Sequence, residues 1–199
     1  MSLRGKTALI TGGGAWPKKA HISLCITTHR QAKTKRLGLK DELSKAHGDL
    51  AVSIHQGDLT TGAAVEKLFQ DAVAKHGKLD IVVNTVGMVL KKPIVEISED
   101  EYDTMFAINS KAAFLILTEA AKVVQDGGKI ITIVTALLAA FTGFYPQESK
   151  EAVEFHKSMA MENRLTNVAD IAPIVTFLCT SGQWMTGQTI FANGGYTTR

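Results

Sequence analysis

Apolar residues along this chain gather in short runs of strand length, separated by segments with helical spacing. The runs are rich in Val, Ile and Thr and show no clear polar alternation, which is typical of strands covered on both faces. We predict strands over residues 7–10, 22–27, 50–55, 81–84, 129–134 and 189–192.

Two helical stretches lie between these strands. Thr61 is suited to cap a helix whose apolar residues recur at i, i+3, i+4, i+7 and i+8, and Gly77 suits a left-handed end. The apolar residues are Val65, Leu68, Phe69, Ala72 and Val73. A capping box from Ser98 to Glu101 begins a second, longer helical stretch, which we expect residues 127–128, both glycine, to end.

Two further helices are predicted nearer the C-terminus. A charged helical segment covers residues 148–161, and a last helix covers residues 168–179. Pro173 conflicts with the last helix, because proline removes a helical hydrogen bond unless it lies in the first turn. Strands that alternate with helices predict an α/β fold, a single domain over residues 1–199 with a doubly wound parallel sheet and helices on both faces.

Two connections are too short for such a fold. Parallel neighbours need a crossover of a dozen or more residues, yet only ten residues, 12–21, separate the first two predicted strands. Between Val134 and Thr189, where a doubly wound sheet normally gains a strand, the only apolar cluster has helical spacing. The sequence therefore predicts that the first crossover helix and one late strand are lacking.

We interpret these two positions as junctions between pieces of a longer polypeptide. Segments would be missing near Ala15/Trp16 and near Tyr145/Pro146. The alternative is a natural deletion variant, which would lose an obligatory layer of the fold together with its buried apolar surface.

Composition excludes several classes of function. Of the 199 residues, 45% are hydrophobic and 21% are charged, as in an ordinary globular protein. The net charge of +3 is too weak to favour nucleic acid or an anionic membrane as a partner. The longest apolar run, residues 130–141, is too short to cross a bilayer.

The cysteines and histidines narrow the picture further. Cys25 and Cys179 form no CxxC motif, so we expect free thiols and a reducing, cytoplasmic location. The six histidines show neither HxxxH nor HExxH spacing, and we expect no metal site.

A glycine cluster follows the first predicted strand and is the strongest indication of function. Thr11 leads into Gly12, Gly13 and Gly14, where the absence of Cβ lets the backbone turn tightly and approach phosphate oxygens. The alternative is a plain tight turn, which would not need three consecutive glycines. The later glycine and the helix of a dinucleotide fold do not follow.

Several pieces in order resemble the short-chain dehydrogenase/reductase family. These pieces are GKTALITGGG (5–14), GDL (57–59), LDIVVNTVG (79–87), IN (108–109), GKII (128–131), DIA (170–172), and MTGQT (185–189) with NGG (193–195). The resemblance implies a Rossmann-type fold and NAD(P)-dependent hydride transfer between nicotinamide and a carbonyl or alcohol. It assigns Thr11 and the three glycines to the diphosphate turn.

The resemblance also assigns two residues to the adenine edge. Asp58 and Leu59 follow the third strand and match that pair, since a carboxylate can accept a hydrogen bond from the exocyclic amine. The alternative for Asp58 is an Asx turn or a helix cap.

A third motif lies at the nicotinamide ribose. Asn84, Thr85, Val86 and Gly87 resemble the family's Asn-Asn-Ala-Gly, altered in the middle, which stabilises the sheet centre and lines the ribose. The alternative is a simple turn from strand to loop.

The end of the second strand indicates the cofactor. No carboxylate stands where NAD-dependent relatives bind the ribose 2′-hydroxyl. Arg30, helped by His29 and Lys33, is suited to hold a 2′-phosphate by charge-assisted hydrogen bonds, which favours NADP(H) over NAD(H). The alternative is a solvated basic loop.

The family's catalytic residues are only partly present. Asn109 matches the helical asparagine that holds a proton-relay water, and the alternative is an exposed helical residue. Ala136 stands at the serine position, and no Tyr-x-x-x-Lys occurs; Tyr145 is followed by Pro146. We hypothesise that the Tyr/Lys pair lies in the segment missing before Pro146.

Three functions follow as hypotheses. The first is an NADP(H)-dependent oxidoreductase of the ketone or aldehyde reductase type, acting on a small molecule. The second is a non-catalytic dinucleotide-binding sensor or scaffold of the same fold, and the third is an interaction module that binds no nucleotide. The resemblance further implies a homodimer or homotetramer, assembled through residues 106–121 and 188–196.

Overall fold

The computed structural model describes residues 3–12, 22–28, 45, 51–88, 90, 92–134 and 149–196, with the backbone alone for residues 22–28. The contacts gather in two compact units, Met1–Gly14 with Lys18–Val134, and Ala15–Pro17 with Thr135–Arg199. The single domain expected from the sequence stays a prediction.

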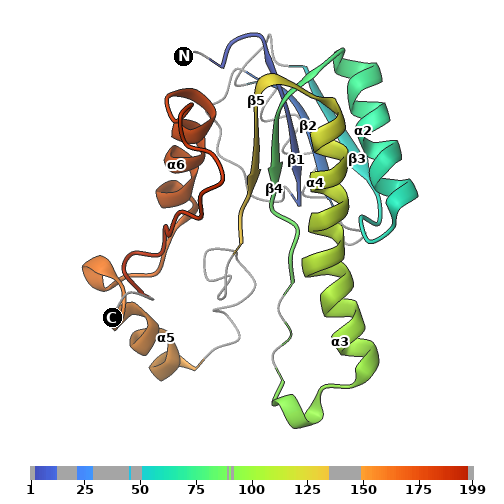
Figure 1. The fold of residues 1–199 in the computed structure, drawn as a ribbon. Helices are drawn as coiled ribbons and strands as arrows, with labels where there is room; N and C mark the ends of the chain where they lie inside the picture. Colours follow the sequence, from blue (N-terminus) through green and yellow to red (C-terminus); the bar gives the residue numbers. More distant parts are fainter. Residues whose placement is uncertain are drawn as a thin grey trace. The chain divides into compact units, whose positions relative to one another are not determined.

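Unit 1 is built on a five-stranded parallel sheet in the order β3-β2-β1-β4-β5 (Figure 1). The strands are β1 (Lys6–Thr11), β2 (Ile22–Thr28), β3 (Val52–Gln56), β4 (Leu79–Asn84) and β5 (Val124–Thr132). Strands β2 and β3 lie on one side of β1, and strands β4 and β5 lie on the other. The sheet is therefore doubly wound. The predicted fold class is therefore confirmed.

Helices connect the later strands of unit 1. They are α2 (Gly62–His76), the short η1 (Ile94–Glu96), α3 (Glu99–Phe106), the π-helical turn η2 (Ala107–Lys111) and α4 (Ala112–Val123). The predicted capping box at Ser98 and Glu101 is present, with both of its hydrogen bonds. Thr61 precedes α2 but its side chain makes no capping hydrogen bond, whereas Gly77 ends α2 with φ 80°.

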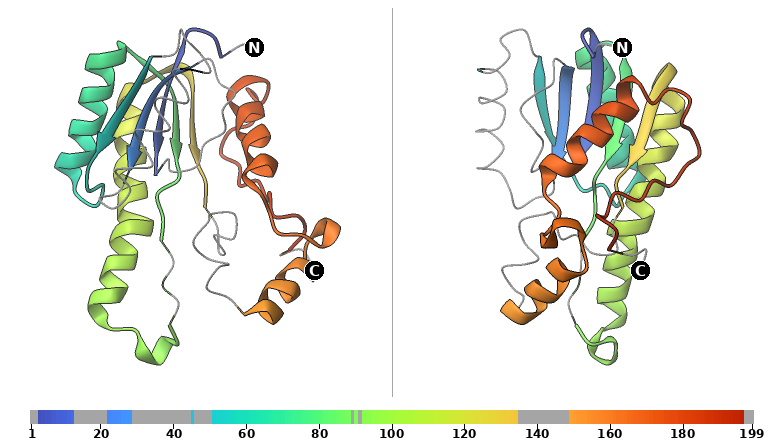
Figure 2. Two further views of the ribbon diagram at one scale, coloured as in Figure 1. Left: turned by 180° about the vertical axis from the view of Figure 1, so that it is seen from behind. Right: turned by 90° about the vertical axis from the view of Figure 1, so that its left-hand side faces the viewer.

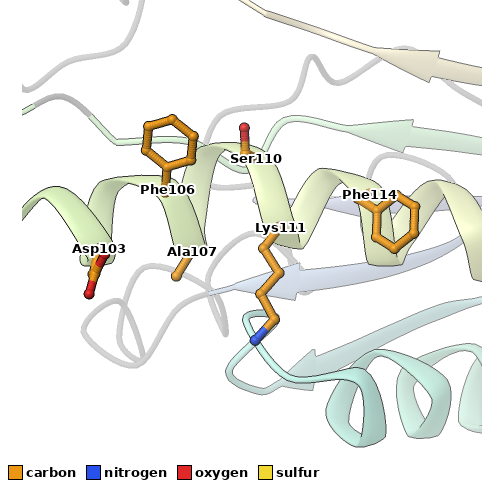
Figure 3. A pocket seen from close by; sticks show the side chains of 6 residues that line it. All are labelled: Asp103, Phe106, Ala107, Ser110, Lys111 and Phe114. Atoms are coloured by element: carbon orange, nitrogen blue, oxygen red, sulfur yellow. The ribbon is translucent and has the colours of Figure 1, made fainter.

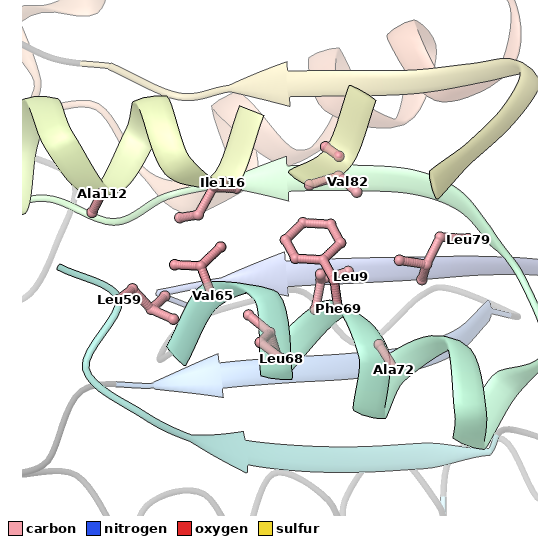
Figure 4. Close-up of a cluster of buried hydrophobic side chains, with 11 residues drawn as sticks. Leu9, Leu59, Val65, Leu68, Phe69, Ala72, Leu79, Val82, Ala112 and Ile116 are labelled. Atoms are coloured by element: carbon pink, nitrogen blue, oxygen red, sulfur yellow. The ribbon is translucent and has the colours of Figure 1, made fainter. Parts of the chain in front are cut away.

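The main core of unit 1 lies between the sheet and helices α2 and α4 (Figure 4). Leu9 of β1 and Val82 of β4 face the apolar stripe of α2. In this stripe, Leu68 and Phe69 are fully buried. From α4, Ile116 completes the cluster. Parallel strands keep their carboxyl ends at one edge, which is the lower edge in Figure 1 and recurs in the views of Figure 2.

The boundary between α4 and β5 differs from the sequence prediction. The helix ends at Val123 and the strand begins at Val124, so the two glycines at 127–128 lie inside β5 instead of ending the helix. Gly127 has φ 75°, and a Cβ on Gly128 would lie 2.6 Å from the carbonyl oxygen of Asp80. The glycines therefore allow an irregularity in β5 that brings its backbone close to β4.

Unit 2 contains α5 (Lys150–Ser158), the short η4 (Met161–Asn163) and α6 (Val168–Thr180), in agreement with the two predicted C-terminal helices. Helix α6 continues through Pro173. Arg164 binds Asp170 with two hydrogen bonds of 2.7 and 2.8 Å, and these bonds lower the pKa of Asp170 to about 2.

The predicted strand at residues 189–192 is wrong. The described part of unit 2 contains no strand, and residues 188–192 are irregular, with Phe191 73% exposed. A strand needs a neighbour for its backbone hydrogen bonds, and no described strand pairs with this segment. Both predicted junctions, Ala15/Trp16 and Tyr145/Pro146, lie outside the described residues.

Within the described ranges, no helix is both long and apolar enough to cross a membrane. The same ranges hold no group of three or more His, Cys, Asp or Glu side chains placed to bind a metal ion.

Candidate functional site

The candidate site lies where the strand order reverses, between β1 and β4. Strand β2 lies beside β1 on one side and β5 lies beside β4 on the other, and ligands of open α/β sheets bind beyond the carboxyl ends of the strands at such a switch point. Thr11 and Gly12 leave β1 at this point, and Asn84 and Thr85 leave β4 beside them. The structure thus brings together two motifs that are about 73 residues apart in the sequence.

Hydrogen bonds fasten the two strand ends to each other. The Thr11 hydroxyl donates to Oδ1 of Asn84 at 2.7 Å. In return, the carbonyl oxygen of Thr11 accepts from the backbone N–H of Thr85 at 3.0 Å and from the Thr85 hydroxyl at 2.6 Å. Thr11 and Asn84 are 0% and 1% exposed, so the bond between their side chains is buried, while the bond from the Thr85 hydroxyl is partly buried. Together the bonds tie the ends of β1 and β4 to each other.

Gly12 begins the turn in a conformation that other residues avoid. Its φ is 77°, and a Cβ at this position would lie 2.7 Å from the Thr85 hydroxyl and 2.8 Å from the Thr85 carbonyl carbon. Both the backbone angle and the lack of space require glycine here. The first glycine of the predicted diphosphate turn is therefore fixed by β4, whereas Gly13 and Gly14 lie outside the described residues.

One buried donor at the site has no partner within the described part of the chain. The side-chain nitrogen Nδ2 of Asn84 makes no hydrogen bond there, although Oδ1 of the same amide accepts from Thr11 and from the N–H of Val86. Buried polar groups are nearly always paired. An unpaired donor beside a turn that only glycine can enter fits a ligand rich in hydroxyl and phosphate groups, as a nicotinamide dinucleotide is.

Thr132 is a neighbouring residue that the sequence analysis did not single out. It is the register partner of Asn84 on β5, and its hydroxyl is also buried without a partner among the residues that the structure describes. Partners on adjacent parallel strands face the same side of a sheet, so the two unpaired groups share one face. A threonine in an apolar strand gives no sequence signal for such a role.

The other residues of the Asn84–Gly87 motif divide between the core and the surface. The side chain of Val86 packs against the hydrophobic core, while Gly87 is exposed.

At the predicted adenine edge, the local alternative for Asp58 is realised. Its Oδ1 accepts from the backbone N–H of Thr60 at 3.0 Å and from the Thr60 hydroxyl at 2.7 Å, an Asx-type turn. Asp58 is exposed, and Leu59 is 7% exposed with its side chain in the core. The turn leaves the adenine role untested.

Asn109 lies in the π-helical turn η2, and its side chain holds the loop that follows β4. Its Oδ1 accepts from the N–H of Met88 at 2.8 Å, and its Nδ2 donates to the Met88 carbonyl at 3.0 Å. The amide group thus completes both backbone bonds of one loop residue. In this structure Asn109 positions the loop, and its role with a relay water stays a prediction.

Replacing Asn109 with alanine should release the loop after β4. We expect faster hydrogen exchange at the Met88 amide and a loss of about 1 kcal/mol of unfolding free energy, because both bonds are exposed to solvent. Gln70→Ala, which removes an exposed i,i+4 bond to Glu66 on α2, is the matched control. Unchanged exchange at Met88 in Asn109→Ala would contradict this positioning role.

A depression lies along the continuous helical segment formed by α3, η2 and α4 (Figure 3). It is lined by Asp103, Phe106, Ala107, Ser110, Lys111 and Phe114. Phe106 and Phe114 are 52% and 66% exposed, and both lie in the segment 106–121 that was predicted as an oligomer surface.

Several predicted site residues lie outside the described part of the chain, namely Gly13, Gly14, His29, Arg30, Lys33 and Ala136. The 2′-phosphate site and the serine position therefore stay predictions.

The geometry defines an α/β protein in which two motifs of the expected nucleotide site meet at the switch point of a doubly wound sheet. A family model described as Enoyl-(Acyl carrier protein) reductase matches residues 19–144. The hydroxynaphthalene reductase-like protein Arp2 of Metarhizium brunneum is 35% identical over 187 residues, which cover 86% of this chain and 68% of that protein. The chain therefore belongs to the short-chain dehydrogenase/reductase family, and it is an NAD(P)-dependent oxidoreductase of this type.

Two further similarities bear on the fold and on the length of the chain. A putative dehydrogenase from Burkholderia cenocepacia, solved with bound NADP, is 35% identical with a TM-score of 0.87, covering 100% of this chain and 96% of that one. A short-chain type dehydrogenase/reductase of Picea abies is 27% identical over 251 positions, covering 97% of this chain and 93% of that protein. This alignment is longer than the 199 residues of the chain, so the relative has residues without a counterpart here.

Proposed function

We propose that this chain binds NADP(H) at the switch point and transfers hydride between the nicotinamide and the carbonyl or alcohol carbon of a small molecule. The observation that carries the proposal is the arrangement at the ends of β1 and β4. There Gly12 begins the turn, and Nδ2 of Asn84 is a buried donor without a partner among the described residues. The Burkholderia cenocepacia relative with bound NADP supports the choice of cofactor.

Different residues of the chain bind different parts of the cofactor. The backbone of the turn from Gly12 to Gly14 approaches the diphosphate, and Arg30 with His29 holds the 2′-phosphate. Asn84 offers its free N–H to the ribose end, and Asn109 orders the loop after β4 through Met88. When bound, the cofactor supplies the hydride.

The proton needed at the substrate oxygen has no donor among the motifs of this sequence. We infer that the Tyr/Lys pair belongs to a segment missing near Tyr145/Pro146. The longer Picea abies alignment supports this, as does the unpaired segment 188–192. If the chain acts without such a segment, a non-catalytic nucleotide-binding protein is the second candidate, favoured by Ala136 and by the absence of Tyr-x-x-x-Lys.

Titration with NADPH and NADH, followed by turnover assays with ketones and aldehydes, separates these functions. Binding with turnover supports the reductase, binding without turnover supports the second candidate, and no binding of either nucleotide overturns both. An intact mass above 21.4 kDa for the expressed protein would establish further segments.

Replacing Arg30 with alanine should discriminate between the two nucleotides. Loss of a charge-assisted bond to the 2′-phosphate should weaken NADPH binding by about tenfold or more and leave NADH binding unchanged. Arg4→Ala, at the exposed start of the chain, is the control. Equal losses for both nucleotides would contradict the assignment of the 2′-phosphate site.

Assembly and location complete the proposal. The family resemblance favours a homodimer or homotetramer through residues 106–121 and 188–196. The exposed Phe106, Phe114 and Phe191 support it, and light scattering of the purified protein tests it. A cytoplasmic location stays part of the proposal.

A further inference from the structure

We propose that Thr85 is a positioning residue for the cofactor's diphosphate, because its hydroxyl fixes the peptide group from which the glycine turn leaves the sheet. The inference rests on the proposed function and deepens it. Thr85 stands where the resembled motif has its second asparagine, so the role belongs to this chain's own departure from that motif.

The Thr11 carbonyl receives one hydrogen bond more than the sheet requires. The bond from the Thr85 N–H, at 3.0 Å, extends the pairing between β1 and β4 by one step. The bond from the Thr85 hydroxyl, at 2.6 Å, is additional and occupies the second lone pair of the oxygen. Two donors from one residue hold this carbonyl in a single direction.

The direction of that carbonyl determines the direction of the Gly12 N–H. Both belong to one planar trans peptide group, in which the C=O and the N–H point in opposite directions. With the carbonyl held toward β4, the Gly12 N–H is held pointing away from β4. The first backbone donor of the proposed diphosphate turn is therefore oriented before any ligand arrives.

Thr85 also determines where the Gly12 α-carbon lies. The site that a Cβ would occupy is only 2.7 to 2.8 Å from the hydroxyl, carbonyl carbon and carbonyl oxygen of Thr85. Contact on this side and φ of 77° together restrict this position to glycine. A turn that is ordered in advance binds its ligand at a lower entropic cost.

The competing explanation is that the hydrogen bonds of Thr85 only hold β1 and β4 together. Loss of such bonds would change the stability of the protein, and any effect on affinity would be the same for every ligand. A positioning role predicts that only ligands carrying a diphosphate lose affinity, because the glycine turn contacts that part of the cofactor alone.

The test compares Thr85→Val with Thr85→Ser in the full chain, using two ligands. NADPH carries the diphosphate, whereas adenosine 2′-monophosphate carries the adenosine end without it. We expect Thr85→Val to weaken NADPH binding about three- to tenfold, the contribution of one hydrogen bond, with adenosine 2′-monophosphate unchanged. Thr85→Ser, which restores the hydroxyl, should bind NADPH within about twofold of the wild type.

Thr176→Val is the matched control, since it removes a threonine hydroxyl that donates to the Ala172 carbonyl at 2.9 Å on α6. Melting temperatures measured without ligand follow folding, and Thr85→Ala replaces Thr85→Val if the latter does not fold. Equal losses for both ligands, or none, would overturn the positioning role while wild-type binding upholds the proposed function. Failure of the wild type to bind NADPH would overturn the proposed function and this inference with it.

Discussion

Replacing Gly12 with alanine should weaken the binding of NADPH by about 100-fold. The new Cβ would lie 2.8 Å from both the carbonyl carbon and the carbonyl oxygen of Thr85, which are backbone atoms that no rotamer change can move. Alanine would also have to adopt a φ of 77°. Backbone strain of this kind costs up to about 3 kcal/mol, and each 1.4 kcal/mol is a factor of about ten in affinity.

Gly77→Ala separates the two causes. Gly77 has nearly the same backbone angle, φ 80°, but no atom lies within 4 Å of the position of its Cβ. It should cost about 1 kcal/mol of unfolding free energy and leave the affinity for NADPH unchanged. Isothermal titration and thermal unfolding of both variants give the comparison. If Gly12→Ala bound NADPH as tightly as Gly77→Ala does, the turn at Gly12 would not be the phosphate site.

The sheet is the part of the fold that the sequence predicted best. β1 and β4 are continuous apolar runs with a burial pattern to match, and α2 has a regular stripe, so burial on both faces left few alternatives. The start of β5 was missed because its first residues, including Gln125 and Asp126, are exposed and carry no apolar pattern. Glycines normally end helices, but these two lie inside an irregular strand. The close approach of the Asp80 backbone explains why residue 128 is glycine.

The failure at residues 189–192 has a different physical cause. The Ile190–Phe191 pair has the composition of a strand, but composition does not supply a neighbour for the backbone. Pairing partners are contributed by distant parts of the chain, and the sequence itself indicated that one such part was lacking. The local prediction and the prediction of a missing segment were therefore in conflict. The structure contradicts the first, and the second stays a prediction.

For the site, the sequence located residues but not their partners. Thr11, Gly12, Asn84 and Thr85 were expected at one site, and the structure places them in contact. Oδ1 of Asn84 accepts hydrogen bonds, whereas its Nδ2 has no partner among the described residues. This difference depends on bond geometry across two strands, which a sequence motif does not encode.

Replacing Asp80 with alanine should cost about 2 to 3 kcal/mol of unfolding free energy at neutral pH. This carboxylate, at the opposite end of the sheet from the site, is 3% exposed and accepts from Lys6 at 2.8 Å, from the Thr7 N–H at 2.9 Å and from Lys78 at 3.3 Å. Without it, the buried N–H of Thr7 loses its partner, which alone costs about 1 to 3 kcal/mol. The two lysines are half-exposed and can turn to solvent, which limits the loss.

The loss should depend on pH in a direction that the ionisation of Asp80 determines. Burial raises the pKa of Asp80, but the bonds from Lys6, Thr7 and Lys78 outweigh it, so the pKa lies below its usual value. A carboxyl with a lowered pKa in the folded state stabilises fully above its unfolded pKa, about 3.9, and loses that contribution as the pH falls through the folded value. The difference between wild type and Asp80→Ala should therefore shrink in acid.

Urea unfolding at several pH values between neutral and strongly acidic measures this difference directly. Asp71→Ala is the control, because Asp71 is 46% exposed and its ion pair with Lys67 should contribute less than about 1 kcal/mol. A difference for Asp80→Ala that stayed constant down to strong acid would mean that the cost comes from lost packing and not from the charge. The network of Lys6, Thr7 and Lys78 would then be a consequence of the strand pairing and not one of its causes.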